Sequence, residues 1–188
     1  MAFAFYSYRP QTGHEHLNLS ALTSIAGEQC MQYMCQGSYF TDITLGVKNI
    51  NTNTTNYGMR YAFADCPNLS AVNFPDLSVI QNTNTNYIFQ YAFQNDKKLS
   101  SVTFPKLTRI GTTTINTGYT FNYAFFNCPN LTSINFPELT SVLTGCQGTF
   151  NTMLWSNVDN AATNYKVCEV HMPKLTTWRQ STNTAQSF

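Results

Sequence analysis

The chain has 188 residues, enough for one domain with a substantial core. Hydrophobic residues make up 43% and aromatic residues 14%, which excludes a disordered chain despite several Asn/Thr tracts. Charged residues make up only 10% and the formal net charge is +1, so electrostatics favour neither nucleic acid nor an anionic membrane surface as a partner.

No window is long and apolar enough for a membrane helix, so we expect no membrane insertion. The opening residues MAFAFYSYRP lack a basic segment followed by a long apolar run, so no signal peptide is predicted in this sequence. A trimmed or mature chain, an intracellular protein and a virion component all remain open.

In chain order, an N-terminal arm or cap over residues 1–16 comes first. Degenerate repeat segments then occupy residues 17–25 and 32–45. Three close copies follow: YAFADCPNLSAVNFPDLSVI from Tyr61, YAFQNDKKLSSVTFPKLTRI from Tyr91 and YAFFNCPNLTSINFPELTSV from Tyr123. A repeat at this spacing predicts a solenoid, in which each copy is one structural unit.

The ends of the pattern define the predicted organisation. Weaker copies at residues 149–157 and 170–178 extend the solenoid to residues 17–178. Residues 179–188 then form a partial rung or a cap, and an uncapped end would permit end-to-end self-association.

Each repeat contains one clear strand. Val72 and Phe74 alternate with Ala71 and Asn73, the period of a strand with one buried face, and Pro75 ends it because proline cannot donate to a ladder. Stacking at about 4.8 Å gives every apolar residue a like neighbour. The sequence therefore predicts a mainly β protein, a parallel β-solenoid of about six rungs, with helix limited to a short turn near Y-A-F.

The pattern A-F-x-x-C-x-x-L-x-x-V/I-x-F-P-x-L-T-x-I resembles the BspA-like leucine-rich repeat family. The likeness is closest in residues 61–142 and looser in 17–60 and 143–178. It implies a leucine-rich-repeat solenoid and adhesion or host-protein binding, as on surface-associated proteins of host-dwelling bacteria and some protists. Repeats here are longer than the family's usual ones because of the Asn/Thr tracts. No individual binding residue is implied.

Six cysteines invite a disulfide interpretation. Cys66 and Cys128 occupy equivalent positions two repeats apart, roughly 10 Å at the spacing of stacked strands, so they are predicted to be thiols. Cys35 takes a Phe position and is expected to pack as a small hydrophobe. Cys146 and Cys168 flank the irregular last repeat and could be close.

Two polar clusters are candidates for reactive sites. His14-Glu15-His16 could offer two metal ligands, but a solvated arm explains it as well. Glu169 and His171 could perform acid/base chemistry, or belong to a polar surface ladder. Without a nucleophile motif or a phosphate-binding loop, we expect no catalysis, cofactor or metal.

Outward positions supply two candidate binding surfaces. The first lies along the main sheet: Thr44, Asn73, Thr103, Asn135 and His171. The second lies in the Asn/Thr tracts: Asn53, Asn82, Asn84, Asn86 and Thr113. Amide and hydroxyl groups in a flat array can bind glycan or protein, although a wet outer wall without a partner is the alternative for both. A ladder of alternating charge is interpreted as structural: Asp76, Lys106, Glu138 and Lys174.

These features favour a non-catalytic binding module, an adhesin-like domain at a cell surface or outside the cell that recognises host protein or glycan. The alternative is a structural or assembly protein, such as a phage tail or fibre component. No nucleic-acid partner is predicted.

Overall fold

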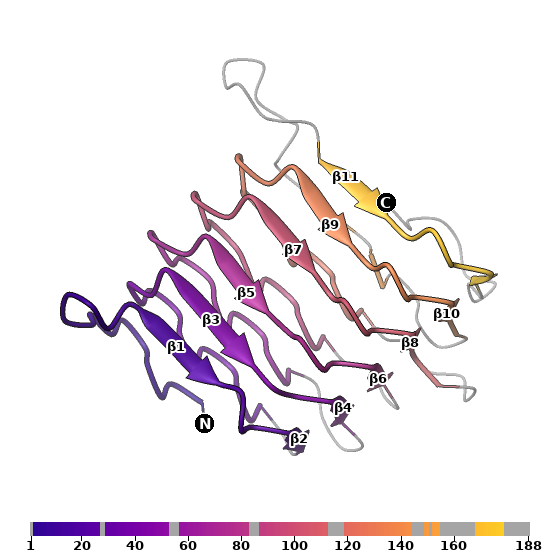
Figure 1. Ribbon diagram of the computed structural model, residues 1–188, viewed down its shortest axis with the longest axis horizontal. Helices are drawn as coiled ribbons and strands as arrows, with labels where there is room; N and C mark the ends of the chain where they lie inside the picture. The colour runs from indigo at the N-terminus through magenta and orange to yellow at the C-terminus, as the bar shows by residue number, and fades with distance from the viewer. Residues whose placement is uncertain are drawn as a thin grey trace.

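Two parallel sheets and one wall of turns form the sides of a β-solenoid in the computed structural model (Figure 1). The structure describes residues 2–26, 29–52, 57–82, 87–112, 119–143, 149–150, 152–154 and 168–178. None of these residues is helical, so the predicted parallel solenoid with little helix is confirmed, and overlapping turns replace the short helix expected near Y-A-F.

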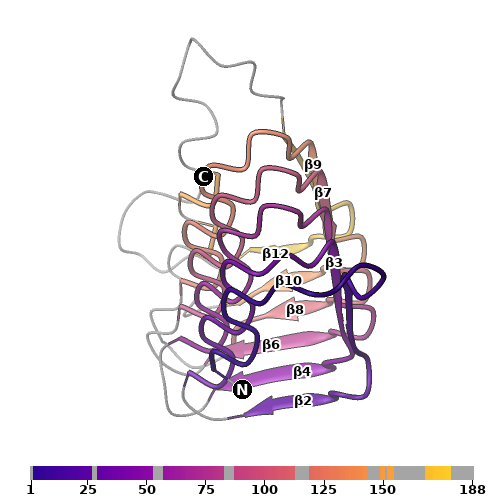
Figure 2. The same cartoon turned by 90° about the vertical axis from the view of Figure 1, so that its left-hand side faces the viewer.

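Each sheet has six strands, one from each repeat. The first sheet contains β1 (His16–Leu19), β3 (Asp42–Leu45), β5 (Ala71–Asn73), β7 (Ser101–Thr103), β9 (Ser133–Asn135) and β11 (Glu169–His171), in that order. The second contains β2 (Ser24–Ala26), β4 (Asn49–Thr52), β6 (Val79–Asn82), β8 (Arg109–Ile110), β10 (Ser141–Val142) and β12 (Thr177–Trp178). Figure 2 shows the second sheet stacked in sequence order, with the turns of successive repeats stacked beside it.

Register places equivalent residues of successive repeats directly above one another. In the first sheet Leu17 pairs with Ile43, and Ile43 with Val72. The buried column of the second sheet runs Ile25, Ile50, Ile80, Ile110 and Val142, and Trp178 continues its register at the β12 edge. A slip by one residue would turn these apolar columns toward solvent, so the alternation itself fixes the register.

Phenylalanine columns fill the core between the three sides. Phe74, Phe104 and Phe136 stack along the first sheet with ring centroids 5.3 and 5.1 Å apart. Two further columns follow the turns: Phe63, Phe93 and Phe125, and Phe89, Phe121 and Phe150. All are buried, and edge-to-face contacts join the columns, so the apolar positions of one repeat are completed only by its neighbours.

The third side, here called the turn wall, consists of residues 29–37, 57–65, 87–95 and 119–127. Alternate residues hydrogen-bond within and between repeats. Ala62 donates its N–H to the carbonyl of Met59 in its own turn, at 3.0 Å, whereas Phe63 donates to Ala92 in the next repeat, at 2.9 Å. Overlapping turns thus satisfy the backbone without a strand or helix.

Positive φ angles recur every four residues along this wall. Asn95 and Asn127 have φ of 62° and 56°, in the left-handed region that asparagine tolerates. Their side chains form a ladder, since Asn127 donates to Asn95, and Asn95 to Asp65, each at 2.7 Å. Tyr61 and Tyr91 adopt φ of 54°, a less favourable conformation for an aromatic residue.

A buried column of short side chains lies beneath the wall, formed by Ser38, Cys66, Asp96 and Cys128. The thiol of Cys66 donates to the carbonyl of Cys35 at 3.1 Å, and that of Cys128 to Phe93 at 2.9 Å. Neither sulfur is in a disulfide, as predicted. Burial raises the pKa of the Cys66 thiol.

Two further cysteine predictions have different outcomes. Cys35 is buried in the column of Phe63, as expected, and burial raises its thiol pKa to about 12. Cys168 is a half-buried thiol, and burial raises its pKa to about 11. Cys146 lies outside the described residues.

The N-terminal arm adds one more layer to the turn wall. Phe3, Phe5 and Ser7 donate their N–H groups to the next layer, at 3.3, 2.7 and 2.7 Å. The Phe3 ring stacks on Tyr33 with centroids 5.0 Å apart. The arm therefore covers the first repeat on this side.

Candidate functional site

The outer face of the first sheet carries the first predicted surface. Register aligns Thr44 with Asn73, Asn73 with Thr103, Thr103 with Asn135, and Asn135 with His171. All five side chains are exposed or half-buried. The structure therefore brings these residues into a single column, and Asn18 of β1 extends it at the N-terminal end.

Hydrogen bonds along this column join its members in pairs. The Nδ2 group of Asn73 donates to Oγ1 of Thr44, and that of Asn135 to Oγ1 of Thr103, both at 3.4 Å. Bonds of this length and exposure are weak, so a ligand can replace them at small cost. No bond among the described residues engages the Oδ1 atoms of these two asparagines.

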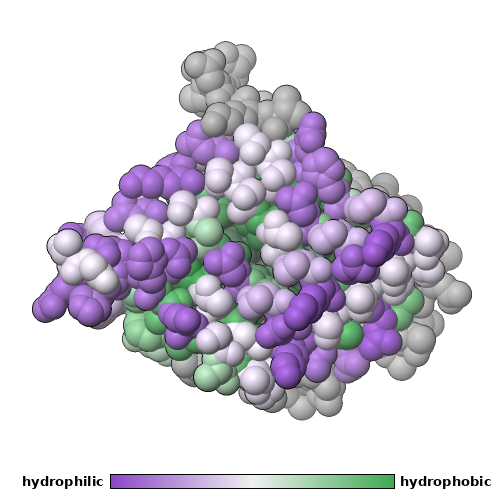
Figure 3. Space-filling view, viewed as in Figure 1, coloured by the Kyte–Doolittle hydropathy of each residue, from purple (hydrophilic) through white to green (hydrophobic). Residues whose placement is uncertain are grey.

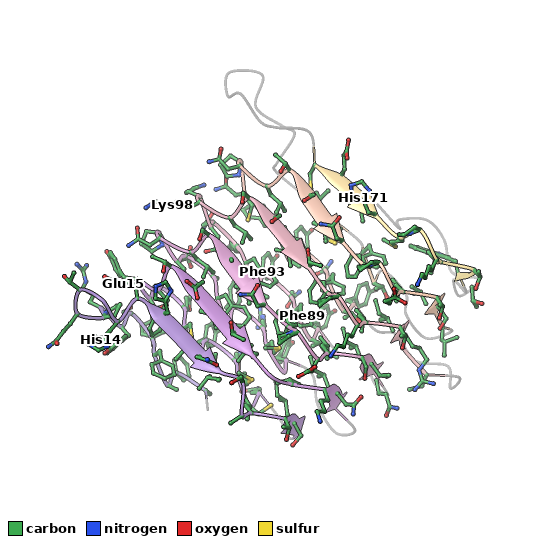
Figure 4. The ribbon with its side chains drawn as sticks, viewed as in Figure 1. His14, Glu15, Phe89, Phe93, Lys98 and His171 are labelled. Carbon is green, nitrogen blue, oxygen red and sulfur yellow. The ribbon has the colours of Figure 1, made fainter. Side chains whose placement is uncertain are left out.

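Charged groups on this face lie at its two edges. His16 Nδ1 pairs with the carboxylate of Asp42 at the β1 edge. At the β11 edge, His171 Nε2 lies 3.1 Å from Glu169 Oε2, with both side chains more than half exposed. Figure 4 shows His171 at the opposite edge from His14 and Glu15, so the histidines cannot act together. Between the edges the face is neutral, and Figure 3 shows it as mostly white and purple.

The two histidine-containing clusters, His14-Glu15-His16 and Glu169 with His171, meet no third potential metal ligand among the described residues. His14 and Glu15 precede β1, and backbone hydrogen bonds lower the pKa of the exposed Glu15 carboxyl. Within the described part of the chain, no three His, Cys, Asp or Glu side chains gather as a metal site would require.

The alternating charge ladder beside the first sheet forms two ion pairs. Lys106 Nζ lies 2.6 Å from Asp76 Oδ1, and Lys174 Nζ lies 2.7 Å from Glu138 Oε1. The hydrogen bond and charge of Lys106 lower the pKa of Asp76. Both pairs are largely exposed, so they contribute to register more than to stability.

The second predicted surface falls almost wholly outside the described residues. Asn53, Asn84, Asn86 and Thr113 belong to segments that the structure does not describe. Asn82 is the last residue of β6, but its side chain is not described either. That surface remains a prediction.

Two tyrosine columns on the turn wall were not predicted as a site. The long tyrosine column contains Tyr33, Tyr61, Tyr91 and Tyr123, and the short tyrosine column contains Tyr57, Tyr87 and Tyr119. A Tyr-x-x-x-Tyr spacing in three repeats was the sequence signal. This signal is hard to see in the sequence because each second tyrosine stands beside the buried residues of the Y-A-F segment.

A family model for the BspA-type leucine-rich repeat region matches residues 11–151 in six copies. The chain belongs to the BspA-type leucine-rich repeat family. Such repeats are typical of protein-binding, adhesin-like modules, which are non-catalytic scaffolds as a rule. No curated protein and no solved structure matched the chain.

Family membership accounts for the scaffold and leaves the binding face open. The BspA-type repeat fixes the residues that build the core and its corners. Hydroxyl groups directly after the second leucine of the repeat illustrate this. Ser78, Thr108 and Thr140 each donate to a carbonyl of the preceding repeat at 3.0–3.1 Å.

The described residues contain no helix that is both long and apolar enough to span a membrane.

Proposed function

We propose that this BspA-type repeat protein is a non-catalytic recognition module that binds a host protein or glycan through the outer face of the first sheet. Parallel sheets are usually covered on both faces, so a parallel sheet with an accessible outer face is uncommon, and that face is available for binding. The observation that carries the proposal is the column from Thr44 to His171, which holds short neutral polar groups in fixed register over five strands.

The chemistry of this column suits hydroxyl- and amide-bearing ligands. Side chains of Asn and Thr are short, so little conformational entropy is lost when they bind. Each offers donors and acceptors together. The absence of charge between the edge pairs favours a neutral partner. A location at a cell surface or outside the cell is part of the proposal, because adhesin-like recognition requires it.

A paired substitution tests the face. Asn73→Ala with Asn135→Ala removes two amides without touching the core. The matched control is Asn68→Ala with Asn130→Ala, two asparagines at the same two-repeat separation in the preceding turns, which contact Lys98 and the carbonyl of Lys97. Loss of two hydrogen bonds at about 0.5–1.5 kcal/mol each predicts binding weakened by roughly fivefold to 150-fold on glycan arrays and immobilised matrix proteins.

The control variant is expected to bind as the wild type does. Equal affinities for wild type and the Asn73/Asn135 variant would remove this face from the proposal. Absence of any glycan or matrix-protein binding by the wild type would count against the recognition function itself.

Assembly is a second candidate function, and one observation favours it. Large exposed apolar side chains among the described residues lie toward the two ends of the chain: Phe3 (56% exposed), Tyr6 (52%), Tyr8 (45%) and Trp178 (36%). Apolar ends with polar faces suit head-to-tail contacts, which generate open filaments. Sedimentation velocity over rising concentration tests this, and a monomer at every concentration would contradict it.

A further inference from the structure

The two tyrosine columns give the turn wall a rigid aromatic surface. Seven of the 11 tyrosines lie in them. Neighbouring rings in the long column are 5.0–5.4 Å apart and within 10° of parallel, and those in the short column are 5.1 and 5.7 Å apart. Since the ring faces contact one another, each half-buried tyrosine offers its edge and hydroxyl to a partner.

Arg60 joins the two columns. Its guanidinium lies over the Tyr57 ring at 4.6 Å and over the Tyr61 ring at 5.0 Å. Its buried Nε has no hydrogen-bond partner, and no carboxylate of the described residues pairs with it. Asp65, the wall's other charged residue, already accepts bonds from Gln36 at 2.8 Å and Asn95 at 2.7 Å.

We propose that the turn wall is a protein-docking face, in which Arg60 receives an Asp or Glu carboxylate of the partner and the tyrosine columns form the surrounding contact. This site is distinct from the outer face of the first sheet. An arginine held by two aromatic rings presents its planar fork already oriented, so a bidentate carboxylate pair forms with little loss of side-chain entropy.

The geometry favours protein over carbohydrate at this wall. A sugar ring that stacks on tyrosine requires a bare aromatic face, and here the faces are occupied by neighbouring tyrosines. Tyrosine and arginine are among the residues most enriched at the centres of protein interfaces, where other charges are depleted. The wall contains two charged residues, Arg60 and Asp65.

The phenol groups are suited to donate hydrogen bonds at this face. Burial raises the pKa of Tyr61, Tyr87 and Tyr91, so these hydroxyls keep their protons at neutral and mildly alkaline pH. Gln90 and Asn122 follow Arg60 in the same column of successive repeats. Gln90 donates to Oδ1 of Asn122 at 3.0 Å, so these two amides are already ordered. Partner contacts would therefore meet prearranged groups.

The backbone adds an independent argument. Tyr33, Tyr61, Tyr91 and Tyr123 have φ between 51° and 57°. Asparagine or glycine would hold this conformation with less strain. Thr152, at the equivalent position of the following repeat, has φ of 51° as well, so the turn imposes this conformation. Tyrosine occurs at four successive equivalent positions despite the strain, which suits a role for the rings at this face.

A displayed library of random peptides, selected on the immobilised full chain, tests the proposal. Enriched peptides are then measured against wild type, Arg60→Gln and Arg109→Gln. Arg109 is the matched control because it is also half-buried with a buried Nε that lacks a partner, but no tyrosine of the described residues lies over it. We expect enriched peptides to contain Asp or Glu, and Arg60→Gln to weaken binding at least tenfold while Arg109→Gln changes it less than twofold.

A double-mutant cycle sharpens the result. Replacing the peptide's acid with its amide should weaken binding to wild type but leave binding to Arg60→Gln unchanged, and Arg60→Lys should recover only part of the affinity. Circular dichroism establishes that the variants are folded. Failure to select any peptide, selection of peptides insensitive to Arg60→Gln, or glycan binding lost in that variant would overturn the proposal. We expect Asn73→Ala with Asn135→Ala to leave peptide binding unchanged, so the experiments test the two proposed faces separately.

Discussion

Replacing Asp96 with asparagine is expected to stabilise the protein at neutral pH. Asp96 is fully buried, and its Oδ1 accepts the N–H of Cys66 at 2.9 Å. Its Oδ2 has no partner among the described residues. In the adjacent layers Cys66 and Cys128 donate from this column to backbone carbonyls. Asparagine would keep the acceptor and supply a donor, as the thiols of Cys66 and Cys128 do at the equivalent positions.

The gain can be sized from the group that lacks a partner. A buried polar atom without a hydrogen bond costs about 1–3 kcal/mol, so satisfying it should raise the free energy of unfolding by that order. For a chain of this length, each kcal/mol corresponds to a rise in Tm of roughly 2–4 °C. Urea unfolding followed by circular dichroism measures the difference directly.

The pH dependence separates this explanation from a general packing effect. Burial raises the folded pKa of Asp96 well above the value of about 3.9 in an unfolded chain. The folded carboxyl therefore keeps a proton that the unfolded one has released, and wild-type stability declines as pH rises through this window. Asparagine does not titrate, so the advantage of Asp96→Asn should grow from pH 4 to pH 8.

A surface acid provides the contrasting control. Lys106 lowers the pKa of Asp76, so this carboxylate contributes stability above its unfolded pKa that is lost as pH falls. The difference between Asp76→Asn and wild type should therefore shrink toward acid pH, the opposite trend. If the stabilities of wild type and Asp96→Asn run parallel across the pH range, the reasoning about the buried carboxyl is wrong.

Two further predictions follow from close packing. A Cβ atom at Gly46 would overlap the backbone carbonyl of Ser20, so Gly46→Ala should lower the free energy of unfolding by about 1–3 kcal/mol. Urea titration measures the change, and an unchanged midpoint would contradict the close approach of these two backbone segments. Burial also raises the thiol pKa of Cys66 and Cys128, so both should resist alkylation by iodoacetamide at pH 8 until urea unfolds the protein. The half-buried Cys30 should react earlier. Mass spectrometry of the labelled peptides measures the order of reaction.

The strands were predictable because their chemistry repeats in register. Val72 and Phe74 alternate with polar neighbours, and three copies of that pattern leave one arrangement that buries every apolar column. The same alternation predicted the outward column from Thr44 to His171. It also placed Cys66 and Cys128 too far apart for a disulfide.

The turn wall could not be derived in the same way. Its residues follow neither the strand period of two nor the helix period of 3.6, since every fourth residue has a positive φ. Local preference argues against that conformation for Tyr61 and Tyr91, and hydrogen bonds to the next repeat, from Tyr61 to Gln90 and from Tyr91 to Asn122, help to stabilise it. Arg60 occurs once, so no periodic signal marked it as a site.

Stacking also explains why so few charges occur in this chain. A charged residue repeated at one position would face its own kind about 4.8 Å away, and two unit charges at about 4 Å repel by roughly 1 kcal/mol in water and about 4 kcal/mol near a protein surface. Neutral amides and hydroxyls avoid this cost in every column. Charges persist where the sign alternates, as from Asp76 to Lys106, or where one repeat carries a charge alone. Arg60 is of the second kind, and Gln90 occupies the next position in its column. The alternating charges are paired with one another, whereas Arg60 has aromatic neighbours and no carboxylate among the described residues, which leaves its charge for the external acid proposed above.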